Sequence, residues 1–209
     1  MFIVKSYEFR FMLSVIPLLL LVGCLKTKQV PKRYSVKPSN YKSVELIEWK
    51  PERKLSWKDF KGGEPSGKHD RLAAITYTAT TFPYIEEKSL YCISVFFVKT
   101  KSEKRNEIND SHANLLNHEQ THFDIAELFV RKARKEIFEV KKFVSEEEVD
   151  SIVNHFLKVE QDYHQLYDDE TGFSKNKEAQ RKWEKRVKEE LEALEKFKHP
   201  CVKVRIKNK

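Results

Sequence analysis

The 209-residue sequence has no internal repeat, no recognisable nucleic-acid-binding motif and a single extended run of mainly apolar residues, 11–23. The chain is too short for two comfortable domains, so one globular domain is the expected organisation. The missing motif argues against nucleic acid as a partner, although the net charge is +8. The apolar run is too short to cross a bilayer comfortably, which argues against an ordinary membrane-spanning helix.

The composition fits a folded body with a strongly charged surface. Charged residues make up 34% of the chain, yet its 14 Phe, 8 Tyr and 3 Trp exceed what a disordered chain would carry. The positive charge either favours anionic lipid or an acidic polymer, or simply covers solvated lysine-rich helix faces. Nothing in the sequence indicates an oligomeric state.

The N-terminus has the pattern of a secretory signal peptide. Two positive charges in residues 1–10 precede the apolar run, which ends at Leu21-Val22-Gly23-Cys24. This ending resembles the bacterial lipoprotein processing box, in which the cysteine is lipidated and becomes the new N-terminus. An ordinary signal peptide and a short membrane anchor are the alternatives.

We therefore predict three regions. Residues 1–23 are a signal peptide, residues 24–43 are a lipidated Cys24 with a flexible tether rich in Lys, Pro and Ser, and residues 44–209 are a single α+β domain. The protein is then exported and held in the bacterial cell envelope by its lipid, facing the periplasm or the cell surface.

Lipidation of Cys24 would leave Cys92 and Cys201. An exported compartment permits disulfides, and two cysteines allow one pairing. The sequence leaves open whether they pair or remain two separate buried thiols.

The first part of the domain has strand patterns. Residues 73–80 alternate with a period of two, and residues 90–98 are nearly all apolar, which predicts an antiparallel pair. Residues 202–206 alternate again and predict a last strand that could bring Cys201 near Cys92. Three aromatic residues before the pair are expected on one face of the sheet: Trp49, Trp57 and Phe60.

The remainder is predicted to be helical. One helix runs from Asp110 or Ser111 to Lys142, a second starts at Ser145 in a capping box with Glu148, and a third covers about 176–198. Strands, then helices, then a returning strand predict an α+β fold with a small antiparallel sheet packed against three long helices.

The chemistry-bearing pattern is His118-Glu119-Gln120-Thr121-His122, an H-E-x-x-H motif. Residues four apart on a helix differ by about 40° in direction, so both imidazoles can bind one ion. Zinc accepts such nitrogens, and Glu119 is placed to act as a base beside the ion. The alternative is that both histidines are ordinary polar residues of a surface helix.

A catalytic zinc normally has three protein ligands. Asp124 and Glu127 point away from the histidine face of the helix, so the third ligand should come from another element. The residues alone leave six later candidates open: His155, Glu160, Asp162, His164, Asp168 and Asp169.

Residues 115–127, which surround the motif, resemble the hallmark of a bacterial domain-of-unknown-function family, number 922, whose members are described as predicted secreted zinc-dependent proteases. Residues 55–60 resemble its early Trp-x-Asp-Phe block. Tyr167-Asp168-x-x-Thr171, followed by Gln180 and Trp183, resembles its late block. The resemblance covers roughly 55–198 and implies a zincin-like helix in a lipidated member of that family.

The late block implies Asp168 as the third ligand, an arrangement that also resembles aspzincin metalloproteases. A turn-capping role for Asp168 is the alternative. The family block often has a histidine two residues after the threonine, where this chain has Phe173. Tyr167, and also Tyr163, are candidates for stabilising an oxyanion, although such tyrosines are more often amphipathic core or rim residues.

The sequence thus predicts an envelope-anchored metalloprotease with one zinc ion, a zinc-bound water and Glu119 as general base, acting on amide bonds of a peptide or protein substrate. The alternative is a non-catalytic lipoprotein whose structural or vestigial metal site serves an envelope interaction module. A basic membrane-proximal domain without metal is a third possibility.

Overall fold

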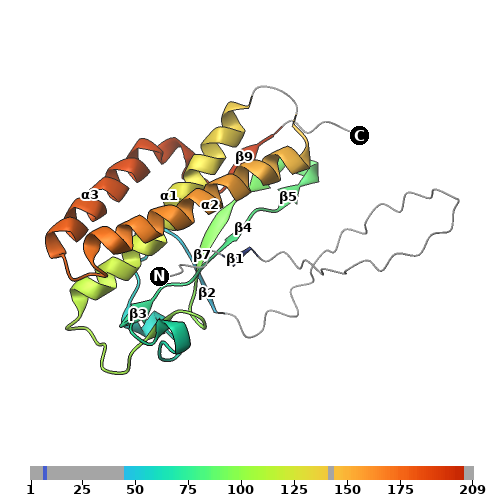
Figure 1. The fold of residues 1–209 in the computed structure, drawn as a ribbon. Helices are drawn as coiled ribbons and strands as arrows, with labels where there is room; N and C mark the ends of the chain where they lie inside the picture. Colours follow the sequence, from blue (N-terminus) through green and yellow to red (C-terminus); the bar gives the residue numbers. More distant parts are fainter. Residues whose placement is uncertain (1–6, 9–44, 141–143, 205–209) are drawn as a thin grey trace, which may run out of the picture.

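The computed structural model describes residues 7–8, 45–140 and 144–204 (Figure 1). The predicted signal peptide, apart from Tyr7 and Glu8, and the predicted lipidation site and tether lie outside these residues. Within the described ranges, no helix is both long enough and apolar enough to cross a membrane.

Three long helices account for most of the fold: α1 (Ala113–Glu139), α2 (Glu146–Thr171) and α3 (Lys177–Ala193). The predicted capping box is present at the start of α2, where Glu148 N donates to Ser145 Oγ and Ser145 N donates to the Glu148 carboxylate. Helix α3 ends earlier than predicted and is followed by the short 3-10 helix η5 (Glu195–Phe197). The three predicted helices are therefore confirmed, with shifted ends.

The strands form three small sheets. A four-stranded sheet has the order β1-β4-β7-β2 and is antiparallel except for the β1–β4 pair. A two-stranded sheet pairs β3 with β8, and a three-stranded sheet has the order β5-β6-β9. The strands span Tyr7–Glu8 (β1), Leu46–Glu48 (β2), Ala74–Ile75 (β3), Thr78–Thr81 (β4), Tyr84–Ile85 (β5), Leu90–Cys92 (β6), Ser94–Val98 (β7), Glu103–Lys104 (β8) and Cys201–Lys203 (β9).

Two predicted strands are each broken into two. Residues 73–80 divide between β3 and β4 because Tyr77 N donates to Ser102 Oγ rather than to a strand. Residues 90–98 divide between β6 and β7 because Ile93 N donates to the carbonyl of Pro200. The prediction of two continuous strands was therefore wrong, whereas the antiparallel pairing of β4 with β7 is confirmed.

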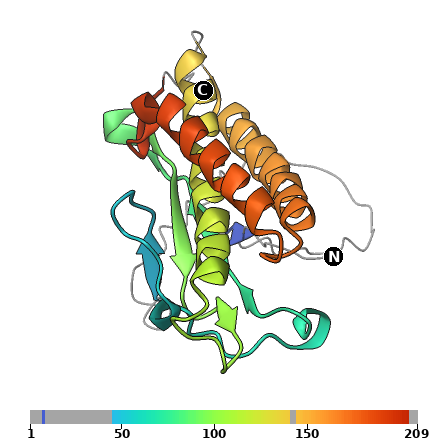
Figure 2. The same cartoon turned by 90° about the vertical axis from the view of Figure 1, so that its left-hand side faces the viewer.

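Helix α1 is the centre of the molecule. It contacts β7 on one side and α2 and α3 on the other (Figures 1 and 2). One hydrophobic core lies between α1, the sheets and the first part of α2, and a second lies between the three helices. This α+β arrangement confirms the predicted fold class and buries α1, including its H-E-x-x-H segment, on nearly all sides.

The predicted aromatic packing is confirmed only in part. Phe60 contacts Trp57 and packs edge-on against Phe97 of β7, with ring centroids 5.1 Å apart. Trp49 instead faces α1, where its indole nitrogen donates to Asp124 Oδ1 over 2.7 Å. The Trp49 indole is therefore oriented by a half-buried acceptor on α1, and does not lie on the apolar face of the sheet.

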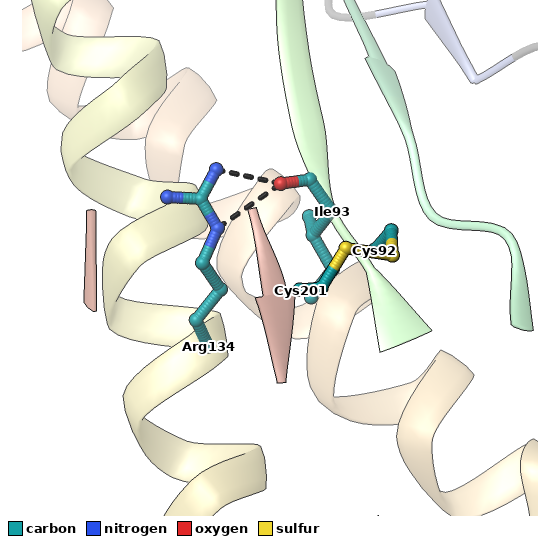
Figure 3. The surroundings of a disulfide bond; sticks show 4 residues. All are labelled: Cys92, Ile93, Arg134 and Cys201. Atoms are coloured by element: carbon teal, nitrogen blue, oxygen red, sulfur yellow. Dashed lines mark hydrogen bonds between the residues drawn. A yellow bond between two sulfur atoms is a disulfide. The ribbon is translucent and has the colours of Figure 1, made fainter. Parts of the chain in front are cut away.

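Cys92 and Cys201 form a disulfide that joins β6 to β9 across 109 residues of sequence. The two strands are paired at this position, with Cys92 opposite Cys201. Figure 3 shows Arg134 of α1 beside the disulfide, with both Nε and Nη2 donating to the carbonyl of Ile93. The disulfide thus links β9 covalently to β6. The hydrogen bonds of Arg134 hold the neighbouring Ile93 carbonyl against α1.

We expect the double variant Cys92→Ser, Cys201→Ser to lose about 2–4 kcal/mol of unfolding free energy, because the unfolded chain regains the entropy of a long open loop. Urea unfolding of the oxidised wild type, the reduced wild type and the double variant measures this loss. The reduced wild type should match the variant, and equal stability of all three proteins would contradict the prediction.

Candidate metal centre

The H-E-x-x-H segment lies in the N-terminal half of α1, a helix that contacts β3. His118 and His122 are one turn apart and both are nearly fully buried. Their Nε2 atoms lie 3.3 Å apart, with the rings edge to face. The spacing of four residues has therefore turned both imidazoles to one point, as predicted.

Helix α2 brings Asp168 to the same point. Its Oδ1 lies 3.0 Å from His118 Nε2 and 3.0 Å from His122 Nε2. Asp168 is 4% exposed, and these three residues form a group that could hold a metal ion. The predicted third ligand is thus brought to the histidine pair.

The donor set fits zinc. A tetrahedron with zinc–ligand bonds of about 2.0–2.1 Å has edges of about 3.3–3.4 Å. The three ligand atoms are separated by 3.0, 3.0 and 3.3 Å, so a small outward shift would place all of them at bonding distance. Two imidazoles and one carboxylate also leave the fourth position of a catalytic zinc site open.

A cavity of about 400 Å³ opens over this triad. Glu119 lines the cavity together with the three candidate ligands, and only 3% of its surface is exposed. Its backbone carbonyl accepts a hydrogen bond from Thr76 Oγ1 over 3.2 Å. No side chain in the described part of the molecule is seen donating to the Glu119 carboxylate, so its oxygens remain available for proton transfer.

The cavity wall is mainly apolar, and the rim carries exposed Arg71 and Lys175. One side follows the segment from Leu72 to Thr76, which includes β3, and the other follows the turn after α2. In that turn Phe173 and Ser174 adopt positive φ angles of 55° and 67°. Asn114 of α1 fixes the turn by donating to the carbonyl of Ser174.

The other candidate ligands fall into two groups. His155, Asp162 and Asp169 are exposed on α2 and do not reach the site. His164 and Glu160 are fully buried behind it: His164 Nδ1 lies 2.9 Å from His122 Nδ1, and His164 Nε2 lies 3.2 Å from Glu160 Oε1. Their spacing of four from one another and from Asp168 is the sequence signal that places all three on one face of α2.

The site is electrostatically coupled. Burial alone would raise the pKa of Asp168, but the adjacent His122 and His118 hold it well below its usual range. Burial alone would lower the pKa of His122, but the charge of Asp168 and its hydrogen bond raise it. Asp168 and His122 thus stabilise each other's charged forms in this buried place.

Behind the triad, burial shifts the pKa values of His164 and Glu160, and neighbouring charges offset these shifts less than they do at Asp168 and His122. Burial lowers the pKa of His164 well below its usual range, and the neighbouring His122 lowers it further. Burial also raises the pKa of Glu160 to about 8. His164 is therefore a neutral imidazole that can both donate and accept a hydrogen bond.

Tyr167 lies behind the histidines and does not line the cavity. Its ring stacks on His118 with centroids 4.6 Å apart and meets His122 edge-on at 5.0 Å. Burial raises the pKa of its phenol. These contacts fix the imidazole planes, and the oxyanion role stays a prediction. Tyr163 lies elsewhere, donating to Glu190 of α3 over 2.9 Å.

The two residues of α1 that were predicted to point away from the site do so. Asp124 accepts hydrogen bonds from Trp49 and Gln120. Glu127 is buried in an ion network with Arg131 and Arg134, at 2.9 Å from each. Both acids therefore hold α1 in place and are not part of the candidate ligand group.

The early and late blocks support the site. Asp59 caps the 3-10 helix η2 (Trp57–Asp59), and Leu55 N donates to the side chain of Gln120 within the motif. Gln180 donates to the carbonyl of Asn114 near the start of α1. Trp183 donates to Glu170 and packs against Tyr167. Gln180 and Trp183 thus connect α3 to both ligand-bearing helices.

Fold and site define an α+β domain with a buried His-His-Asp centre between two helices. Residues 98–176 match the family described as "Bacterial protein of unknown function (DUF922)", which confirms the predicted resemblance over this segment. The matched segment contains the motif and Asp168 but excludes the early block, Gln180 and Trp183. Searches of curated proteins and of solved structures found no match.

Proposed function

We propose that this protein is a zinc-dependent hydrolase, and specifically a metalloprotease, that cleaves amide bonds in a peptide or protein. One observation carries the proposal: three ligand atoms of His118, His122 and Asp168 converge within 3.0–3.3 Å at the floor of a cavity that Glu119 also lines. The family match supplies the motif but no activity, so the proposal rests on this geometry.

In the proposed reaction, His118, His122 and Asp168 would hold a zinc ion, which would supply Lewis acidity to a water molecule and to the amide carbonyl. The Glu119 carboxylate takes the proton from the attacking water and delivers it to the leaving amine nitrogen. The apolar wall from Leu72 to Ile75 excludes bulk water and can accept an apolar substrate side chain. Tyr167 keeps the ring of His118 in position from behind.

We further propose that the protein works outside the cytoplasm, anchored through lipidated Cys24. The bond between Cys92 and Cys201 supports export because disulfides persist mainly in oxidising compartments. Radiolabelled fatty acid incorporation that disappears in Cys24→Ala tests the anchor. Continued incorporation in that variant would contradict it.

Cleavage of a peptide library by the full chain tests the activity. We expect turnover that a chelator removes and that added zinc restores, because the three ligands hold an exchangeable ion at an open cavity. Mass spectrometry of the products gives the bonds cleaved. Zinc binding without any cleavage would instead favour the interaction module with a structural metal site.

A further inference from the structure

Behind the three ligand atoms lies a chain of buried polar groups that the proposed reaction does not use. His122 Nδ1 lies 2.9 Å from His164 Nδ1, and His164 Nε2 lies 3.2 Å from Glu160 Oε1. His164 is 1% exposed and Glu160 is not exposed at all. The chain therefore runs from a candidate zinc ligand into the space between the helices, away from the cavity.

The donors and acceptors of His122, His164 and Glu160 can be arranged in two ways, which differ in the direction of the hydrogen bonds. In one, His122 Nδ1–H donates to His164 Nδ1, and His164 Nε2–H donates to the Glu160 carboxylate. In the other, every proton is reversed: a protonated Glu160 donates to His164, His164 donates to His122, and His122 carries its proton on Nε2. Only the first direction leaves the lone pair of His122 Nε2 facing the metal position.

The state of Glu160 is tied to that of His122, because Glu160 accepts in the first direction and donates in the second. Its second oxygen, Oε2, has no hydrogen-bond partner among the described residues. No lysine or arginine lies within ion-pair distance of it there either, so a cation bound to His122, at the other end of these hydrogen bonds, would stabilise its ionised, accepting form. A metal ion on His122 and an accepting Glu160 thus favour each other.

We propose that His164 and Glu160 are positioning residues, which hold His122 in the tautomer that binds the ion; this inference rests on the zinc site proposed above. A ligand histidine commonly donates its second ring N–H to a carboxylate or carbonyl. Here an intervening neutral imidazole carries that contact to a carboxylate one helical turn away on α2. The Glu160-His164-Asp168 spacing then serves one purpose, with Asp168 as ligand and the other two as support.

Chelator competition on the full chain measures the effect on zinc affinity. We expect His164→Leu to weaken zinc binding by about 10–100-fold, as the loss of such supporting groups does. His164→Asn should retain most of the affinity, because its Oδ1 can accept from His122 Nδ1–H. Leu157→Ala is the matched control. It removes a buried apolar side chain from the same helix but leaves the hydrogen bonds among His122, His164 and Glu160 intact.

Two results of this experiment would overturn the inference: wild-type affinity in His164→Leu, or an equal loss in Leu157→Ala. A wild-type protein that binds no zinc would instead remove the proposed function, and this inference with it. The two failures are therefore distinguishable.

Nitrogen-15 NMR of the zinc-loaded wild type tests the tautomer without any variant. We expect His164 to carry its proton on Nε2 and to have an unprotonated Nδ1, and His122 to carry its proton on Nδ1. A purely structural role for the pair would not fix these protons. A protonated His164 Nδ1 in the zinc-loaded protein would overturn the inference.

Discussion

Glu119→Gln is expected to lower kcat for peptide cleavage by at least about 10²–10⁴-fold while the zinc content stays unchanged. The amide keeps the volume and shape of the side chain in its buried place at the cavity, but it cannot accept a proton from water. The three ligand atoms come from other residues, so the ion should bind as before. Steady-state kinetics on a peptide that the wild type cleaves, together with metal analysis, measures both quantities.

Glu136→Gln provides the control for this variant. It makes the same chemical change at an exposed position of α1, away from the cavity, and should leave kcat unaltered. Full activity of Glu119→Gln would show that another group handles the proton. Loss of zinc in Glu119→Gln would show that the carboxylate belongs to the metal shell.

Asp168→Ala is expected to weaken zinc binding by more than about 100-fold, because removing a ligand should cost more than removing a residue that merely supports one. The change takes away the oxygen that lies 3.0 Å from both imidazole nitrogens. It also removes the negative charge that lies beside both imidazoles and would attract a cation. Chelator competition against the wild type gives the ratio.

The neighbouring Asp169 is the matched control for that change. It is exposed, and it accepts a hydrogen bond from Gln165 on the outer face of α2. Asp169→Ala should therefore bind zinc like the wild type. Equal affinities of Asp168→Ala and the wild type would show that the third ligand lies elsewhere.

The helices and the histidine pair could be predicted because local sequence determines them. The Ser145–Glu148 capping box sets the start of α2, and the apolar period sets its buried face. The direction of His118 and His122 follows from helix geometry once their spacing is known. None of these features depends on a distant part of the chain.

The strand breaks could not be predicted because their causes are distant. Tyr77 is held by Ser102, and Ile93 is held by Pro200 and by Arg134 of α1. A period-two pattern indicates which side chains are buried on one face, but it does not indicate which segment forms the backbone hydrogen bonds of each residue. Tertiary partners therefore divided two apparently continuous strands among three sheets.

The candidate third ligand could be predicted only in part from the sequence. Local reasoning left six candidates, and the family resemblance, not the spacing, selected Asp168. The packing of α2 on α1 brings one face of α2 to the histidines. Along that face, Asp168 reaches the Nε2 atoms while His164, one turn earlier, meets the back of His122.

X-ray absorption at the zinc edge, on the full chain equilibrated with zinc and then freed of excess metal, tests the central claim most directly. The account predicts one zinc ion per chain, with a shell of nitrogen and oxygen at about 2.0–2.1 Å that contains two imidazoles. A chain that retains no zinc, or a shell without imidazole scattering, would contradict it.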